Sequence, residues 1–270
     1  MIPSEASLTM DFSLLEQAIE CFNALLEGAD VLLGHPPSRQ EEWFRFEALS
    51  DAAFGPRVVQ RIAQQAQAEG QAAGTYTLRY VLYGPLALAG YLFAAHNVVI
   101  RLHDHLLIAD SQWLNHARWI DPSFLAPPSG APPAEALFAE LEGLVGPLID
   151  SWDSQKLVAR ANAWACAIDS LAYGFQLAGK TTLNPNVAWA KWESAVAGRV
   201  FPVRRRPRRF LFTIDDHRDE LLIRSGCCLW FTQPAAKNSP AHYCASCYIQ
   251  SDERRLEQLI TLRRKQASHA

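Results

Sequence analysis

The chain of 270 residues carries 25 Lys and Arg against 28 Asp and Glu, a formal net charge of −3. Hydrophobic residues make up 49% of it and charged residues 20%, a composition that supports a buried core and excludes a disordered or fibrous protein. The slightly negative charge argues against a general nucleic-acid-binding protein, which is usually basic.

Helical periodicity dominates the first two-thirds of the chain. Apolar residues repeat at spacings of three and four, which places them on one face of a helix. The predicted helices span residues 11–27, 58–68, 78–95, 134–151, 154–177 and 187–196. Residues 98–120 show extended character instead, and the apolar runs 98–100 and 106–108 flank a polar turn, as in a β-hairpin. Five prolines within residues 122–133 predict a loop or a linker between lobes.

The segment after residue 200 differs in character. The apolar runs 210–214 and 221–223 flank a polar turn and predict a second hairpin. Residues 252–265 predict a final helix, with Ser251 as its cap, acids in the first turn and bases in the last. We therefore predict an α+β fold with a mostly helical N-terminal lobe over residues 1–200. Residues 201–270 would form a small antiparallel β portion and a cysteine-rich module.

One apolar segment tests the expectation of a soluble protein. Tyr80–Ile100 contains no Asp, Glu, Lys or Arg over 21 residues, which is long enough to span a bilayer. It also contains glycines, a proline, His96 and Asn97, which favour a buried helix that runs into a strand. The N-terminal residues lack the basic and apolar stretches of a secretory signal. We therefore expect no membrane span and a cytoplasmic location, with peripheral attachment at the inner membrane as an alternative.

Four of the six cysteines fall within 21 residues near the C-terminus: Cys227, Cys228, Cys244 and Cys247. In the cytoplasm, clustered thiols are more often metal ligands or redox groups than disulfides. A Cys-x-x-Cys turn can hold one metal, and an adjacent pair can do so where the backbone bends, for which Gly226 is suited. The pattern is compatible with a [2Fe–2S] cluster, with structural zinc and with redox thiols. Cys21 and Cys166 lie on apolar helix faces and are expected to be buried.

The sequence around these cysteines resembles a family signature. Arg224-Ser-Gly-Cys227-Cys228-Leu-Trp-Phe, followed by Tyr243-Cys244-Ala-Ser-Cys247, is similar to the C-terminal signature of the FhuF-like ferric-siderophore reductases. The spacer between the two pairs, fifteen residues, is longer than is usual in that family. The resemblance implies a siderophore-reductase-like domain over residues 1–200 and a [2Fe–2S] cluster ligated by all four cysteines. It also implies one-electron reduction of an Fe(III)-siderophore, with release of Fe(II) for iron assimilation.

Arginines precede the cysteine module. Six fall within residues 199–209 with no acid among them: Arg199, Arg204, Arg205, Arg206, Arg208 and Arg209. They either form a docking surface for an anionic iron complex or an acidic redox partner, or protect a solvated edge strand from pairing. Arg224, three residues before Cys227, is placed to stabilise the extra negative charge of a reduced cluster.

The chain contains no glycine-rich dinucleotide fingerprint and no phosphate-binding loop. We therefore expect electrons from an external donor such as a ferredoxin or a flavin reductase, a ferric siderophore as substrate, and no nucleic acid as partner. Two alternatives remain open. One is a zinc-stapled, non-enzymatic binding or scaffold protein, and the other is an iron–sulfur electron carrier that does not act on siderophores.

Overall fold

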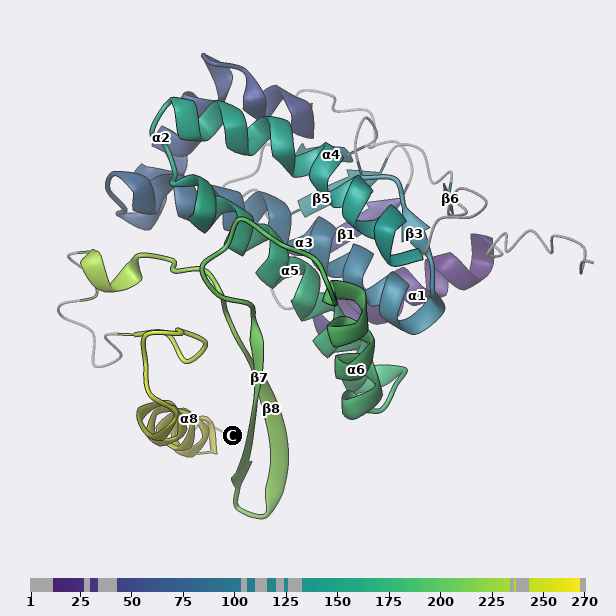
Figure 1. Ribbon diagram of the computed structural model, residues 1–270. Coiled ribbons are helices and arrows are strands. Elements are labelled where there is room, and N and C mark those ends of the chain that lie inside the picture. Colours follow the sequence, from purple (N-terminus) through teal and green to yellow (C-terminus); the bar gives the residue numbers. More distant parts are fainter. Residues whose placement is uncertain are drawn as a thin grey trace, which may run out of the picture.

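The computed structural model describes residues 12–26, 30–33, 43–102, 106–109, 116–119, 124–125, 133–233, 236 and 243–267. Within these residues the protein is α+β and mostly helical (Figure 1), which confirms the predicted fold class. The described α-helices are α1 (Phe12–Leu25), α2 (Phe54–Ala66), α3 (Gln71–His96), α4 (Pro133–Ser154), α5 (Arg160–Thr181), α6 (Pro185–Val196) and α8 (Asp252–Ala267). The described 3₁₀ helices are η2 (Phe46–Ser50) and η3 (Trp230–Thr232).

Small sheets accompany the helices. The described strands are β1 (Asp30–Leu33), β2 (Trp43–Arg45), β3 (Val99–Ile100), β4 (Leu106–Ala109), β5 (His116–Trp119), β6 (Phe124–Leu125), β7 (Arg208–Ile214) and β8 (His217–Ile223). One sheet has the strand order β1-β5-β4-β2, in which β1 and β5 are parallel and the other neighbours are antiparallel. The strands β3 and β6 form an antiparallel pair, and β7 and β8 form the predicted C-terminal hairpin.

The predicted hairpin between residues 98–100 and 106–108 is wrong. The first run forms β3, which pairs with β6 in the register Val99↔Leu125 and Ile100↔Phe124. The second run forms β4, which has β2 on one side and β5 on the other, so neither edge of β4 is available to β3. Short apolar runs show that a segment is extended, but the tertiary fold chooses the partner strand.

The boundary between α4 and α5 also differs from the prediction. Residues 154–177 were predicted as one helix, whereas α4 continues to Ser154 and α5 begins only at Arg160. Lys156 takes a left-handed φ of 58° between them, and the Leu157 N–H donates to the Trp152 carbonyl at 2.9 Å. This arrangement satisfies the end of α4 with a backbone turn, which the apolar spacing could not reveal.

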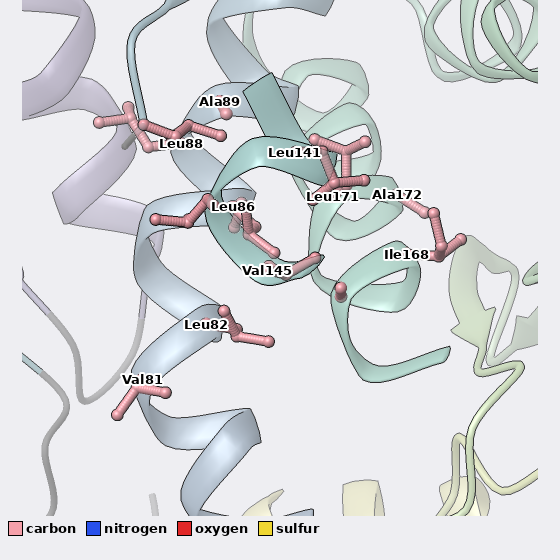
Figure 2. Packing of buried hydrophobic residues seen from close by; sticks show 14 of the residues in the cluster. Val81, Leu82, Leu86, Leu88, Ala89, Leu141, Val145, Ile168, Leu171 and Ala172 are labelled. Carbon is pink, nitrogen blue, oxygen red and sulfur yellow. The ribbon is translucent and has the colours of Figure 1, made fainter. Parts of the chain in front are cut away.

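The core lies where α3, α4 and α5 pack together. Figure 2 shows Leu82 and Leu86 of α3 near Val145 of α4, with Ile168 and Leu171 of α5 beside them. These side chains are fully buried. Burial of a Leu or Ile side chain contributes about 1.5–3 kcal/mol, so this layer of contacts holds the helical part together.

Glycines set the closest approach of α3 and α5. A Cβ at Gly174 of α5 would overlap the Ala87 carbonyl oxygen and lie 2.6 Å from the Tyr91 nitrogen. A Cβ at Gly90 of α3 would overlap the Leu171 carbonyl oxygen. The two backbones therefore touch directly at this crossing, and a larger side chain would have to push them apart.

The helix α3 is long and apolar enough to cross a membrane by length and composition alone. Of its most apolar stretch, 78% is buried inside the protein, as in the core helix of a soluble protein. Such a single helix is weak evidence in either direction. The absence of a membrane span therefore stays a prediction.

The segment after α6 leaves the helical part as a long hairpin. The strands β7 and β8 project from the helices, and α8 lies beside β7 (Figure 1). In the middle of β8 the hairpin is joined to α5, because Gln176 Nε2 donates to the Glu220 carbonyl at 3.1 Å. The predicted loop at 122–133 falls largely outside the described residues, which include its residues 124–125 as β6 and its last residue as the start of α4.

Candidate functional site

The first cysteine pair follows directly on β8 and is held against α5 by Asp169. One Asp169 oxygen accepts hydrogen bonds from the Ser225 N–H at 2.6 Å and the Ser225 hydroxyl at 2.7 Å. The other accepts from the Gly226 N–H at 3.0 Å. Because both backbone donors just before Cys227 bind one buried carboxylate, the turn that carries the pair is fixed to the helix.

Asn162, also on α5, holds Cys227 itself. Its side-chain oxygen accepts from the Cys227 N–H at 2.9 Å, and its amide nitrogen donates to the Cys227 carbonyl at 2.9 Å. The same amide nitrogen lies 3.1 Å from the Thr75 hydroxyl of α3. The backbone of Cys227 is therefore tied to both long core helices through one side chain.

The backbone bends at Ser225 and Gly226, just before the adjacent pair, as predicted for Gly226, and Leu229 after the pair is left-handed. Leu229 takes a φ of 59°, and its N–H donates to the Cys227 sulfur at 3.3 Å. Gly226 is needed for space: a Cβ there would lie 2.9 Å from the Ala165 Cβ of α5. A left-handed leucine costs free energy and persists only where its surroundings impose it, so the local contacts hold the two thiols in this arrangement.

The second pair lies on a tight turn that α8 holds from below. The Cys247 N–H donates to the Cys244 carbonyl at 2.9 Å. Arg255 of α8 is fully buried and donates to the carbonyls of Ala245 and Cys247, both at 2.7 Å. The turn is also joined to the first pair, because the Arg224 N–H donates to the Ser246 carbonyl at 3.0 Å. A main-chain hydrogen bond thus links the segments that carry the two cysteine pairs.

The two pairs meet at their sulfurs. The Sγ atoms of Cys228 and Cys244 lie 4.0 Å apart, one from each pair. Arg224 donates to both: its Nη2 lies 3.8 Å from the Cys228 sulfur and also contacts the Cys244 sulfur. All four cysteines are free of disulfides. A single guanidinium therefore bridges sulfurs of both pairs.

The thiols influence one another's ionisation. A hydrogen bond from Cys244 lowers the pKa of Cys247 to about 7. Bonding to Cys228 favours the Cys244 thiolate, but its contact with Cys247 and burial outweigh this and raise the pKa of Cys244. Burial raises the pKa of Cys227, and the nearby charges of Cys228 and Cys244 add to the effect. Most of these thiols are therefore protonated at neutral pH, and a bound metal would displace those protons.

The donor set can be compared with the metal groups that the sequence suggested. Two thiolates on one tetrahedral metal stand about 3.8 Å apart, given a metal–sulfur bond of about 2.3 Å. The 4.0 Å between Cys228 and Cys244 is close to this separation. Among the described residues, no three or more His, Cys, Asp or Glu side chains form a group that could hold a metal ion as they stand. The four thiols fit a [2Fe–2S] cluster in number and chemistry, and tetrahedral zinc would use the same four sulfurs.

A second cation lies beside the thiols. Arg79 of α3 shares a cavity of about 170 Å³ with Arg224 and Cys227, between α3, α5 and β8. Burial alone would lower the pKa of Arg79, but the nearby acidic groups Cys166, Cys228 and Asp169 raise it. Arg79 is therefore charged at every pH at which the protein is folded.

The predicted arginine surface divides into two parts. Arg208 pairs with Asp252 at 2.6 Å and Arg209 with Glu220 at 2.5 Å, so these two serve structure. Arg204, Arg205 and Arg206 are exposed, and the Arg205 guanidinium lies 4.9 Å from the centre of the Tyr248 ring. Because Tyr248 follows Cys247 directly, the exposed part of the surface lies next to the cysteine centre.

The remaining cysteines lie apart from the quartet. Cys166 is buried, as predicted, and burial raises its pKa to about 12, which makes it an unreactive thiol. Cys21 is exposed, which corrects the prediction of burial. On α1 the apolar face consists of its neighbours Leu15, Ile19 and Phe22, and Cys21 falls on the side away from them.

Sequence reasoning missed four residues of the site: Asn162, Asp169, Arg79 and Arg255. The signal that points to Asp169 is a buried acid within an apolar helix, which requires a partner. No comparable signal marks Arg255, which stands in a run of charged residues at the start of α8. Its burial follows only from the docking of α8 under the cysteine turn.

The arrangement gathers four thiols, two guanidiniums and an adjoining cavity at the junction of α3, α5 and the C-terminal segment. Thiols beside positive charge are a donor set that a metal group could use. Comparison with protein-family models, with curated proteins and with solved structures found no match.

Proposed function

We propose that this protein is a ferric-siderophore reductase with a [2Fe–2S] cluster held by Cys227, Cys228, Cys244 and Cys247. The observation that carries the proposal is the meeting of the two cysteine pairs beneath the Arg224 guanidinium. The resemblance of the cysteine signature to the FhuF-like reductases supports the same conclusion. When bound, such a cluster supplies one electron at a time.

Arg224 is the residue best placed to tune such a centre. Reduction adds a negative charge near the sulfurs, and a buried cation in contact with two of them stabilises that charge. Arg224 therefore favours the reduced state. The N–H of Leu229, which donates to the Cys227 sulfur, acts in the same direction.

The overall reaction transfers one electron and leaves no bond between protein and substrate. An external one-electron donor protein, of the ferredoxin or flavin-reductase class, is oxidised, and the siderophore iron goes from iron(III) to iron(II). The lower charge weakens the bonds to the hard oxygen donors, so iron(II) exchanges out of the complex. The exposed surface formed by Arg204, Arg205 and Arg206 suits an acidic donor.

The cofactor is tested on the freshly purified protein, handled without oxygen. We expect a red-brown solution with broad visible absorbance and with iron and sulfide in equal amounts. The Cys228→Ser protein should lose the colour, whereas the Cys21→Ser protein should keep it, because Cys21 is exposed and lies outside the quartet. A colourless protein with stoichiometric zinc would contradict the proposal.

The reaction is tested with ferric hydroxamate and ferric catecholate complexes in the presence of an iron(II) chelator. The protein is reduced with dithionite, freed of excess reductant and mixed with each complex. Trapped iron(II) should match the reduced protein in amount and be absent with Cys228→Ser. A coloured protein that yields no more iron(II) than this variant would be an electron carrier instead.

A further inference from the structure

The cavity beside the cysteine centre is a candidate binding site in its own right. It has a volume of about 170 Å³ and is partly open to solvent. The helices α3 and α5, the strand β8 and the cysteine segment form its walls. Five of its lining residues carry the argument that follows: Arg79, Tyr83, Asp169, Tyr173 and Arg224.

The cavity has more hydrogen-bond donors than acceptors. Arg79 makes no ion pair and no hydrogen bond with any residue that the structure describes. Arg224 is only 9% exposed, and its Nε is buried without a hydrogen-bond partner among the described residues. The buried Nε of Arg224 is costly unless something accepts from it, whereas Arg79 is partly exposed and can turn its donors into the cavity.

The carboxylate in the wall is already occupied. Both oxygens of Asp169 accept hydrogen bonds from Ser225 and Gly226, within the turn that carries the cysteines. Asp169 therefore compensates only part of the two positive charges. The sulfurs of Cys228 and Cys244 also accept from Arg224, so the groups left over in the cavity are further guanidinium donors without an oxygen acceptor, and the fork geometry of arginine recognises a pair of oxygens.

The size and the aromatic wall limit what can enter. A volume of 170 Å³ would take about five water molecules or one small organic group. Tyr83 and Tyr173 line the same cavity as a stacked pair, with ring centroids 5.2 Å apart and an interplanar angle of 28°. Flat aromatic side chains next to cations favour a planar anion over a bulky or tetrahedral one.

We propose that this cavity binds a small planar anion that carries two oxygens, through Arg79 and Arg224. The chemical class comprises carboxylates, hydroxamates and catecholates. On the proposed function, the occupant would be one chelating arm of the iron(III) complex, held against Cys227. The binding site itself follows from the cavity and its charges and does not depend on that assignment.

Calorimetric titration of the full-length protein with benzoate, and with its neutral analogue benzamide, tests the site. Benzoate should bind at one saturable site and benzamide should not. Arg79→Gln should weaken benzoate binding about 10-fold to 100-fold, the usual effect of losing a charged hydrogen-bond partner. Arg79→Lys, which keeps the charge and loses the fork, should fall between the two. Titration with benzohydroxamate and catechol then shows which class binds most tightly.

Arg204→Gln is the matched control, because it removes an exposed arginine outside the cavity. Thermal unfolding of each variant confirms that the fold is intact. Three results would each overturn the inference. The protein could bind benzoate and benzamide with equal affinity, Arg79→Gln could leave the affinity for benzoate unchanged, or Arg204→Gln could lower that affinity as much as Arg79→Gln does. If the protein binds benzoate but releases no iron(II) from ferric siderophores, the proposed function is wrong and this inference stands. If it releases iron(II) but does not bind benzoate, this inference is wrong and the proposed function stands.

Discussion

Asp169 is the buried acid of a helix whose buried faces are mostly apolar, and its carboxylate binds the turn that carries the first cysteine pair. Asn162, two turns earlier on the same side of α5, binds the backbone of Cys227. At the scale of single residues, the position of the thiols is thus decided by polar side chains of the helical part. The cysteines provide the donors, and α5 provides their placement.

The raised pKa of Asp169 should be visible in how the free energy of unfolding depends on pH. Burial raises its pKa to about 6 from an ordinary value of 3.8, so the folded state binds more protons than the unfolded state between these values. Stability therefore falls as the pH rises from about 4 to 6, by at most about 3 kcal/mol from this group. Asp169→Asn cannot titrate, so its stability should approach or exceed that of the natural protein as the pH rises.

Urea unfolding of both proteins at several pH values measures this difference. All other titrating groups are shared and cancel in the comparison. A stability difference that instead grew in favour of the natural protein between pH 4 and 6 would mean that the fold stabilises the carboxylate, which would contradict the raised pKa.

Arg224 makes a prediction about the cofactor. Arg224→Gln removes the cation in contact with the sulfurs of Cys228 and Cys244. The midpoint potential should become more negative by about 60 mV or more, which corresponds to the loss of one charged hydrogen bond. Redox titration followed by visible absorbance measures the shift, and Arg204→Gln should leave the potential unchanged. An unchanged potential in Arg224→Gln would show that this arginine is structural only.

At the scale of elements, one side of α5 packs in the core and another side binds the cysteine segment. Leu171 lies beside Leu141 of α4 (Figure 2) and its carbonyl meets Gly90 of α3, whereas Asn162 and Asp169 face the cysteine segment. The helix α8 acts on the opposite side, where buried Arg255 binds the carbonyls of the second cysteine turn. The cysteine centre is therefore held between two helices that are far apart in the sequence.

The crossing of α3 and α5 makes a stability prediction. Gly174→Ala would drive a methyl group into the backbone of α3 at Ala87 and Tyr91. We expect a loss of about 3 kcal/mol in the free energy of unfolding, at the upper end for overpacking, because rigid backbone cannot yield as a side chain can.

Gly146→Ala is the matched control for that substitution. It lies inside α4, and an added Cβ there meets nothing within 4 Å. The ring of Pro147, which follows directly, disfavours a Cβ on the helical residue before it and offsets the gain in helix propensity, so we expect a change of no more than about 1 kcal/mol in either direction. Urea unfolding of the two variants measures both effects, and similar values for the two would show that the crossing has room to relax.

At the scale of the whole molecule, positive charge is gathered near the cysteine centre in a chain whose net charge is −3. Arg79 and Arg224 line the inner cavity, and Arg204, Arg205 and Arg206 lie exposed next to Tyr248. An anionic small ligand and an acidic protein could therefore approach the same centre from different directions.

The exposed surface formed by Arg204, Arg205 and Arg206 should set the rate at which an acidic donor protein reduces this protein. Changing Arg204, Arg205 and Arg206 together to Gln should lower the second-order rate of reduction by a ferredoxin about 10-fold at low salt. The difference should vanish near 1 M salt, where charges are screened beyond about 3 Å. The control changes Arg57, Arg160 and Lys180 to Gln, which alters the net charge equally elsewhere on the surface. Stopped-flow kinetics at several salt concentrations measure the rate of reduction of each variant. If the two triple variants are slowed equally, the arginines do not form a specific docking surface.

The fold class and most helices could be predicted, because apolar spacing follows directly from helix geometry. The hairpin β7–β8 and the helix α8 were predicted for similar reasons. The pairing of β3 with β6 and the gap between α4 and α5 were not, because strand partners and helix ends depend on distant residues. For the site, Arg224 was foreseen, whereas the exposed Arg204–Arg206 run and the ion-paired Arg208 and Arg209 looked alike in sequence.

The sequence by itself determined the α+β composition and the four sulfur donors, since residue type and spacing are written in the chain. Only the tertiary structure decided that Leu229 takes a left-handed φ after the pair, and that Cys228 meets Cys244. It also brought Arg79 to the centre from about 150 residues away, and Arg255 from beneath it. Contacts of this kind arise from helix packing, in which the burial of distant apolar faces places polar groups that no local pattern connects.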